Sequence, residues 1–76
     1  MGNTTKRERF ETVASNRVQR ILDTLRLLQN CSNKNNYEYT EKDVDRMFSE
    51  ISVAVKDAKQ AYIKELNKRN KSAFKF

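Results

Sequence analysis

The sequence lacks histidine, proline and tryptophan, and it holds one glycine and one cysteine. Without histidine, the chain has neither the most common general base nor the most common metal ligand of proteins. One glycine, at position 2, excludes a glycine-rich phosphate-binding loop. The lone Cys31 excludes an intramolecular disulfide framework, which suits a reducing compartment, and the residues next to it offer no base to activate its thiol. We therefore expect a protein that is not an enzyme and that uses no cofactor.

Acidic residues do not form a convincing metal site either. Glu41, Asp43 and Asp45 lie two positions apart, and this spacing points their side chains in different directions on a helix. Their ordinary role is to complement the positive end of a helix dipole. We expect no metal.

Long apolar runs are absent as well. No stretch approaches the ~20 residues that span a bilayer, and the N-terminus lacks the apolar segment of a signal peptide. We expect a cytoplasmic protein that does not contact a membrane. A chain of 76 residues allows one small domain, residues 1–76.

Two amphipathic helices fill most of this chain. Thr5 with Glu8, and Thr40 with Asp43, have the spacing of a helix-capping box. Apolar residues then recur at steps of three and four along residues 6–29 and 41–70. In the first helix they are Phe10, Ala14, Val18, Ile21, Leu25 and Leu28, with Val13 and Leu22 widening the stripe. In the second they are Val44, Met47, Phe48, Ile51, Ala54, Val55, Ala58, Tyr62 and Leu66.

The predicted fold is all-α, an antiparallel two-helix hairpin. Two helices bury too little apolar surface to make a stable monomer of this size. We therefore expect dimerisation or a partner protein to complete a four-helix bundle.

The remaining segments are a disordered lead (residues 1–4), a connector (residues 30–39) and a basic aromatic tail (residues 71–76). Four asparagines in the connector tolerate left-handed backbone and make side-chain turns, and a Schellman-type end is expected at Asn30. Tyr37 is expected to staple the connector onto the second helix, with Tyr39 beside the cap.

The net charge of +6 is unevenly placed. Placed on a wheel at about 100° per residue, four cations of the first helix fall along one flank: Lys6, Arg9, Arg17 and Arg20. Such a strip suits nucleic-acid phosphates or an acidic protein groove. The alternative is that these residues border the core and pair with acids of the second helix such as Asp57 or Glu50; Arg17, nearest the apolar face, fits this role best.

The C-terminal segment interleaves charge and aromatic rings through Lys68, Arg69, Lys71, Phe74, Lys75 and Phe76. The cations suit phosphates, and the rings suit stacking on bases or insertion into a protein pocket. Alternatively, the cations complement the helix C-terminus and Phe76 folds onto the core.

A second contact surface is predicted for protein partners. Val53 and Ile63 are apolar positions on the outer side of the second helix. The connector residues Asn33, Lys34, Tyr37 and Tyr39, together with Phe74 and Phe76, complete the candidate partner-binding set.

The block from Leu27 to Val44, LLQNCSNKNNYEYTEKDV, resembles small uncharacterised bacterial proteins of plasmids, phages and integrative elements. The resemblance covers the connector and the flanking helix ends. It implies a mobile-element setting, and it brings no activity and no functional residues.

Three functions remain open. The first is a small basic accessory protein that binds nucleic acid or a nucleoprotein complex through electrostatic, weakly sequence-specific contacts. The second is a protein-binding inhibitor or adaptor, for example against a host nuclease or defence complex, and either would act as a homodimer or hetero-complex. The third is a structural homo-oligomer without a ligand.

Overall fold

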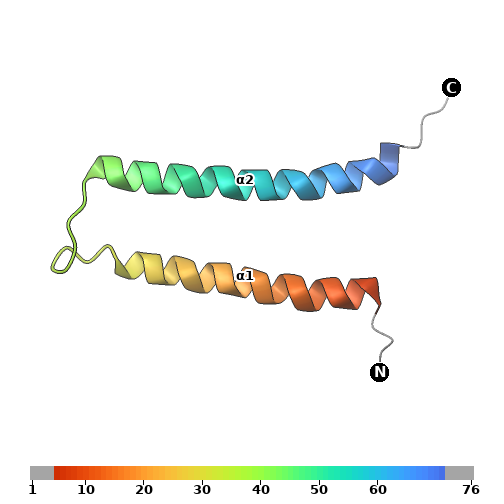
Figure 1. The fold of residues 1–76 in the computed structure, drawn as a ribbon, viewed down its shortest axis with the longest axis horizontal. Helices are drawn as coiled ribbons and strands as arrows, with labels where there is room; N and C mark the ends of the chain where they lie inside the picture. Colours follow the sequence, from red (N-terminus) through yellow and green to blue (C-terminus); the bar gives the residue numbers. More distant parts are fainter. Residues whose placement is uncertain (1–4, 72–76) are drawn as a thin grey trace. The chain divides into compact units, whose positions relative to one another are not determined.

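The computed structural model describes residues 5–71, and the side chains of residues 5–68. It holds two helices, α1 (Lys6–Asn30) and α2 (Glu41–Lys71), and no strand among the described residues (Figure 1). The all-α prediction of two helices joined by a short connector is confirmed. The chain divides into two units, residues 1–38 and residues 39–76, each built on one helix. The predicted lead at residues 1–4 lies outside the described residues.

α1 begins at a complete capping box. The Glu8 N–H donates to Thr5 Oγ1, and the Thr5 N–H donates to Glu8 Oε1, both at 3.0 Å. Thr5 itself is extended, with φ −74° and ψ 165°. Two of the backbone N–H groups that a helix start leaves unpaired are thereby satisfied, and the start predicted from the Thr5–Glu8 spacing is confirmed.

α1 ends differently from the prediction. Asn30 is still helical, and the cap residue Cys31 is right-handed, with φ −74° and ψ −5°. The N–H groups of Cys31 and Ser32 donate to the carbonyls of Leu28 and Gln29, each at 3.0 Å. The helix thus closes with i→i−3 bonds of the 3₁₀ type, so the predicted Schellman ending at Asn30 is wrong.

Asn33 supplies the hydrogen-bond acceptors of the turn in the connector. Its side-chain oxygen accepts the Asn35 N–H at 2.9 Å, which makes an Asx-type turn. Its carbonyl accepts the N–H groups of Asn36 (3.1 Å) and Tyr37 (3.0 Å). The side-chain turn expected of these asparagines is therefore present, and one asparagine makes it.

α2 also begins at a reciprocal pair. The Thr40 N–H donates to Asp43 Oδ2 at 2.8 Å, and the Asp43 N–H donates to Thr40 Oγ1 at 3.2 Å. Tyr39 and Val44 occupy the two positions of a hydrophobic staple around this cap, and both are half-buried. Tyr37 is 52% exposed, so the staple predicted for Tyr37 falls on Tyr39.

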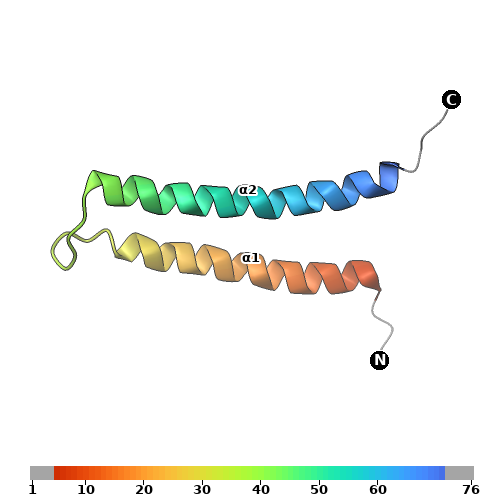
Figure 2. The same cartoon turned by 45° about the horizontal axis from the view of Figure 1, so that its top comes forward.

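α2 continues without interruption to Lys71, as Figure 2 shows along its length. It contains neither Gly nor Pro, the residues most unfavourable inside a helix. Its C-terminal bound lies one residue beyond the predicted one and takes in the first residue of the predicted tail.

No described residue is buried, and each helix taken by itself leaves its apolar stripe exposed. The apolar stripe of α1 remains open to solvent at Phe10 (46% exposed), Val18 (52%) and Ile21 (58%). The stripe of α2 is open at Phe48, Val55, Tyr62 and Leu66. Within the described part of the chain, no helix is long and apolar enough to cross a membrane.

Candidate functional site

The candidate site is the basic strip, defined as Lys6, Arg9, Arg17 and Arg20 of α1. All four side chains are exposed. Because they belong to one continuous helix, its regular turn alone aligns them over about 21 Å, the rise from residue 6 to residue 20. The spacing of the strip therefore follows from local structure.

The two other arginines of α1 are neutralised by acids of their own helix. Arg7 Nε lies 3.0 Å from Glu11 Oε2, four residues on, and its guanidinium lies 5.6 Å from the centre of the Phe10 ring. Arg26 Nη1 lies 3.1 Å from Asp23 Oδ1, three residues back. Both pairs are exposed and contribute only a few tenths of a kcal/mol each.

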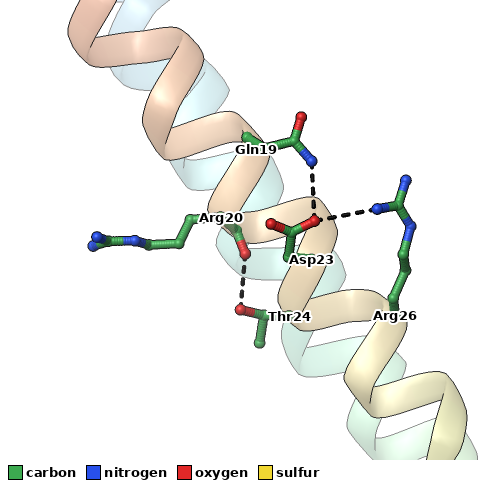
Figure 3. A network of polar contacts seen from close by, with 5 residues as sticks. All are labelled: Gln19, Arg20, Asp23, Thr24 and Arg26. Carbon is green, nitrogen blue, oxygen red and sulfur yellow. Dashed lines mark hydrogen bonds and ion pairs between the residues drawn. The ribbon is translucent and has the colours of Figure 1, made fainter.

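Figure 3 shows that the Asp23 carboxylate binds Gln19 and Arg26 and does not bind Arg20. The oxygen that binds Arg26 also accepts Gln19 Nε2 at 3.0 Å. The Arg20 side chain points away from this group, and its backbone carbonyl accepts the Thr24 hydroxyl at 2.8 Å (Figure 3). Asp23 thus holds Arg26 and leaves the charge of Arg20 free for another partner.

None of the four strip cations forms a hydrogen bond or ion pair through its side chain in the part of the chain that the structure describes. The helix therefore sorts its basic residues: those off the strip are paired, and those on it are not. The sequence analysis missed this division. Part of its signal lies in the sequence, because Lys6, Arg9 and Arg17 have no acid three or four positions away. Arg20 has Asp23 three positions on, and only the structure shows that Asp23 binds Arg26 instead.

Apolar atoms lie beside the strip. Side chains on one flank of α1 line a shallow open hollow; they are Lys6, Arg9, Phe10, Val13, Ala14 and Arg17. Cationic and apolar groups thus share one surface, with Arg17 next to the apolar stripe and Arg9 and Arg20 farther around the helix. A ligand on this surface meets positive charge first and apolar atoms at its edge.

The C-terminal half of the predicted anion-binding set is described only at Lys68. Its Nζ lies 3.6 Å from Glu65 Oε2, so its charge is partly compensated. Arg69 and Lys71 belong to α2, and their side chains lie outside the described residues, as do Phe74, Lys75 and Phe76. Among the described residues, the candidate anion-binding surface is therefore the strip on α1.

The candidate partner-binding residues divide by exposure. Tyr37 and Val53 are 52% and 53% exposed, and Asn33 and Lys34 are exposed as well. Tyr39 and Ile63 are half-buried. Tyr37 and Val53 are therefore the residues of this set best placed to meet a partner, whereas Tyr39 serves the start of α2.

The start of α2 carries a perturbed carboxylate. The hydrogen bond from the Thr40 backbone N–H, reinforced by the Thr40 side chain and by the nearby charge of Arg46, lowers the pKa of Asp43. Asp43 thus has a local structural role. Among the described residues, no three His, Cys, Asp or Glu side chains cluster as metal ligands would, and Cys31 is exposed.

Comparison with known proteins finds no match: no family model, no curated protein and no solved structure is similar to the chain.

Proposed function

We propose that the protein is a small, non-enzymatic accessory protein that binds nucleic acid or a nucleoprotein complex through the basic strip of α1. One observation carries the proposal: four exposed cations align on one helix flank, and none is neutralised by a neighbour among the described residues. Unpaired Lys and Arg side chains displace the counterions of phosphates, which drives non-specific binding.

The mode of binding follows from the residue types. Phosphate contacts position a protein without reading sequence, so the complex is weakly sequence-specific. The protein acts as a homodimer or within a hetero-complex, because two helices bury too little apolar surface to make a stable monomer. The resemblance of the Leu27–Val44 block suggests a bacterial mobile element as its setting, in the cytoplasm.

The direct test is a binding titration with a short mixed-sequence DNA duplex at several salt concentrations. We expect affinity to fall steeply with salt, and the double variant Arg9→Ala/Arg20→Ala to bind more weakly, with a log–log salt slope reduced by about 2. The matched control is Arg7→Ala/Arg26→Ala, which removes the same charge from paired positions of the same helix. Equal losses in the two variants, or binding that ignores salt, would contradict the proposal.

A protein-binding inhibitor or adaptor is the second candidate. The observation that favours it is the exposure of Tyr37 in the connector and Val53 on α2, two large side chains that meet solvent. One stoichiometric protein partner whose binding is lost with Tyr37→Ala and kept with Arg9→Ala would establish this function. The opposite pattern would support the basic strip.

A further inference from the structure

Both helices present apolar faces that need a partner, and α1 presents the wider one. From Val13 to Leu22 its apolar positions span about 180° of the helix circumference at 100° per residue. A two-helix seam uses a narrower stripe, and a face this wide suits a helix with two helical neighbours. The chain contains one other described helix, so two helical neighbours of α1 cannot both come from the same chain.

Charge indicates which helix that neighbour is. On α2, Asp43, Glu50 and Asp57 follow one another at seven-residue steps and form an acidic row one position outside the edge made by Met47 and Ala54. Asp43 is occupied by Thr40. Glu50 and Asp57 are exposed, and among the described residues neither has a hydrogen-bonded or ion-paired side chain.

The acidic row and the basic strip lie on corresponding borders of their apolar faces. Seen along each helix from its N-terminus, Arg17 lies just inside the Val13 edge of the α1 face, and Glu50 lies just outside the Met47–Ala54 edge of the α2 face. Both are on the same side of their apolar face. When two antiparallel helices pack face to face, residues on the same side of each apolar face meet, as matching flanking positions do in antiparallel coiled coils. An antiparallel α1–α2 pair therefore sets basic against acidic residues, whereas two α1 helices joined along this border would set cations against cations.

We propose that α2 of a second copy of this chain covers the apolar face of α1 in antiparallel orientation, with Arg17 against Glu50 and Asp57. The reciprocal contact, α2 of the first copy on α1 of the second, makes the interface two-fold and closes the assembly as a dimer. Arg9 and Arg20, farther from the apolar face, stay outside the interface. In this dimer Arg17 serves the interface, and Lys6, Arg9 and Arg20 are the strip residues left for the proposed function. The dimer does not depend on that function.

The test exchanges charges between two chains, in the absence of nucleic acid. One variant carries Arg17→Glu, and the other carries Glu50→Lys and Asp57→Lys. Alone, each variant sets like charges against each other at both contacts. We therefore expect its dimer to have a dissociation constant about tenfold higher than that of the wild-type dimer. Mixed one to one, the two restore opposite charges at both contacts, and we expect a heterodimer as stable as the wild-type dimer.

Sedimentation equilibrium over a dilution series, with one chain carrying an absorbing label, gives the dissociation constants of all three species. The control is Arg26→Glu, the same reversal on the same helix at an arginine already paired with Asp23, and it should leave the dimer unchanged. A wild-type chain that stays monomeric would overturn the proposal. Recovery of the dimer only when Arg17→Glu, Glu50→Lys and Asp57→Lys are combined in one chain would also overturn it. So would a dimer whose dissociation constant is unchanged by Arg17→Glu.

Discussion

Thr40 and Asp43 exchange two hydrogen bonds across the first turn of α2, at 2.8 and 3.2 Å, and thereby fix where the longer helix begins. The same exchange joins Thr5 and Glu8 at the start of α1. Each helix thus carries its own start signal within four residues.

Replacing Thr40 by Ala should raise the pKa of Asp43 only in part, because the backbone N–H at position 40 still donates to the carboxylate while the side-chain contribution is lost. It should also reduce the helicity of α2. The substitution removes the hydroxyl that accepts the Asp43 N–H, at a cost typical of a lost cap, about 1 kcal/mol. A carboxylate pKa lowered by folding stabilises the helix above the ordinary pKa, and this contribution is lost as the pH falls through the lowered value. Carboxyl NMR chemical shifts of Asp43, followed from pH 7 to pH 2, measure the pKa in the wild-type protein and in the variant. Identical titration curves in the two proteins would contradict the prediction.

Tyr39→Ala should loosen the first turn of α2, and Tyr37→Ala should not. Tyr39 is half-buried at the staple position opposite Val44, whereas Tyr37 is 52% exposed. We expect faster amide hydrogen exchange at Val44 and its neighbours in the Tyr39 variant alone. Val44→Ala supplies the reciprocal test, because Val44 occupies the other position of the same staple.

Asn33→Ala should release the connector turn without disturbing either helix. Its side-chain oxygen is the acceptor of the Asn35 N–H, and alanine has no side-chain acceptor to replace it. The Asn35 amide should exchange faster and shift in the NMR spectrum, while the circular dichroism signal at 222 nm stays constant. Asn36→Ala is the control, since the structure uses the Asn36 backbone N–H in the turn.

Asp23→Ala should destabilise α1 slightly and leave its surface more positively charged. It breaks the hydrogen bond from Gln19 and the ion pair with Arg26, both exposed, which together stabilise the helix by roughly 0.5–1 kcal/mol. It also frees the Arg26 guanidinium. Thermal unfolding followed by circular dichroism measures the first effect. If the proposed function holds, duplex affinity at low salt should rise by a few fold.

Local signals explain what the sequence could predict. The pairs Thr5–Glu8 and Thr40–Asp43 start both helices as expected, because capping depends on residues three positions apart. The end of α1 at Cys31 was not predicted. Four asparagines nearby favoured a left-handed ending, yet the chain closed with 3₁₀-type bonds that any residue type makes through its backbone.

The candidate site was predicted in position but not in detail. The wheel placed Lys6, Arg9, Arg17 and Arg20 on one flank, because helical geometry alone decides this. Which arginines stay unpaired depends on rotamers, as the contacts of Arg7 and Arg26 show.

Every hydrogen bond and ion pair named above joins residues no more than four positions apart, and this bears on how fast the molecule forms. Closing such short loops takes nanoseconds, and helices of this length form within about a microsecond. A slower kinetic phase would then report the encounter of apolar faces. If that encounter involves two copies, its half-time should halve when the protein concentration doubles, while the half-time of helix formation stays the same at every concentration.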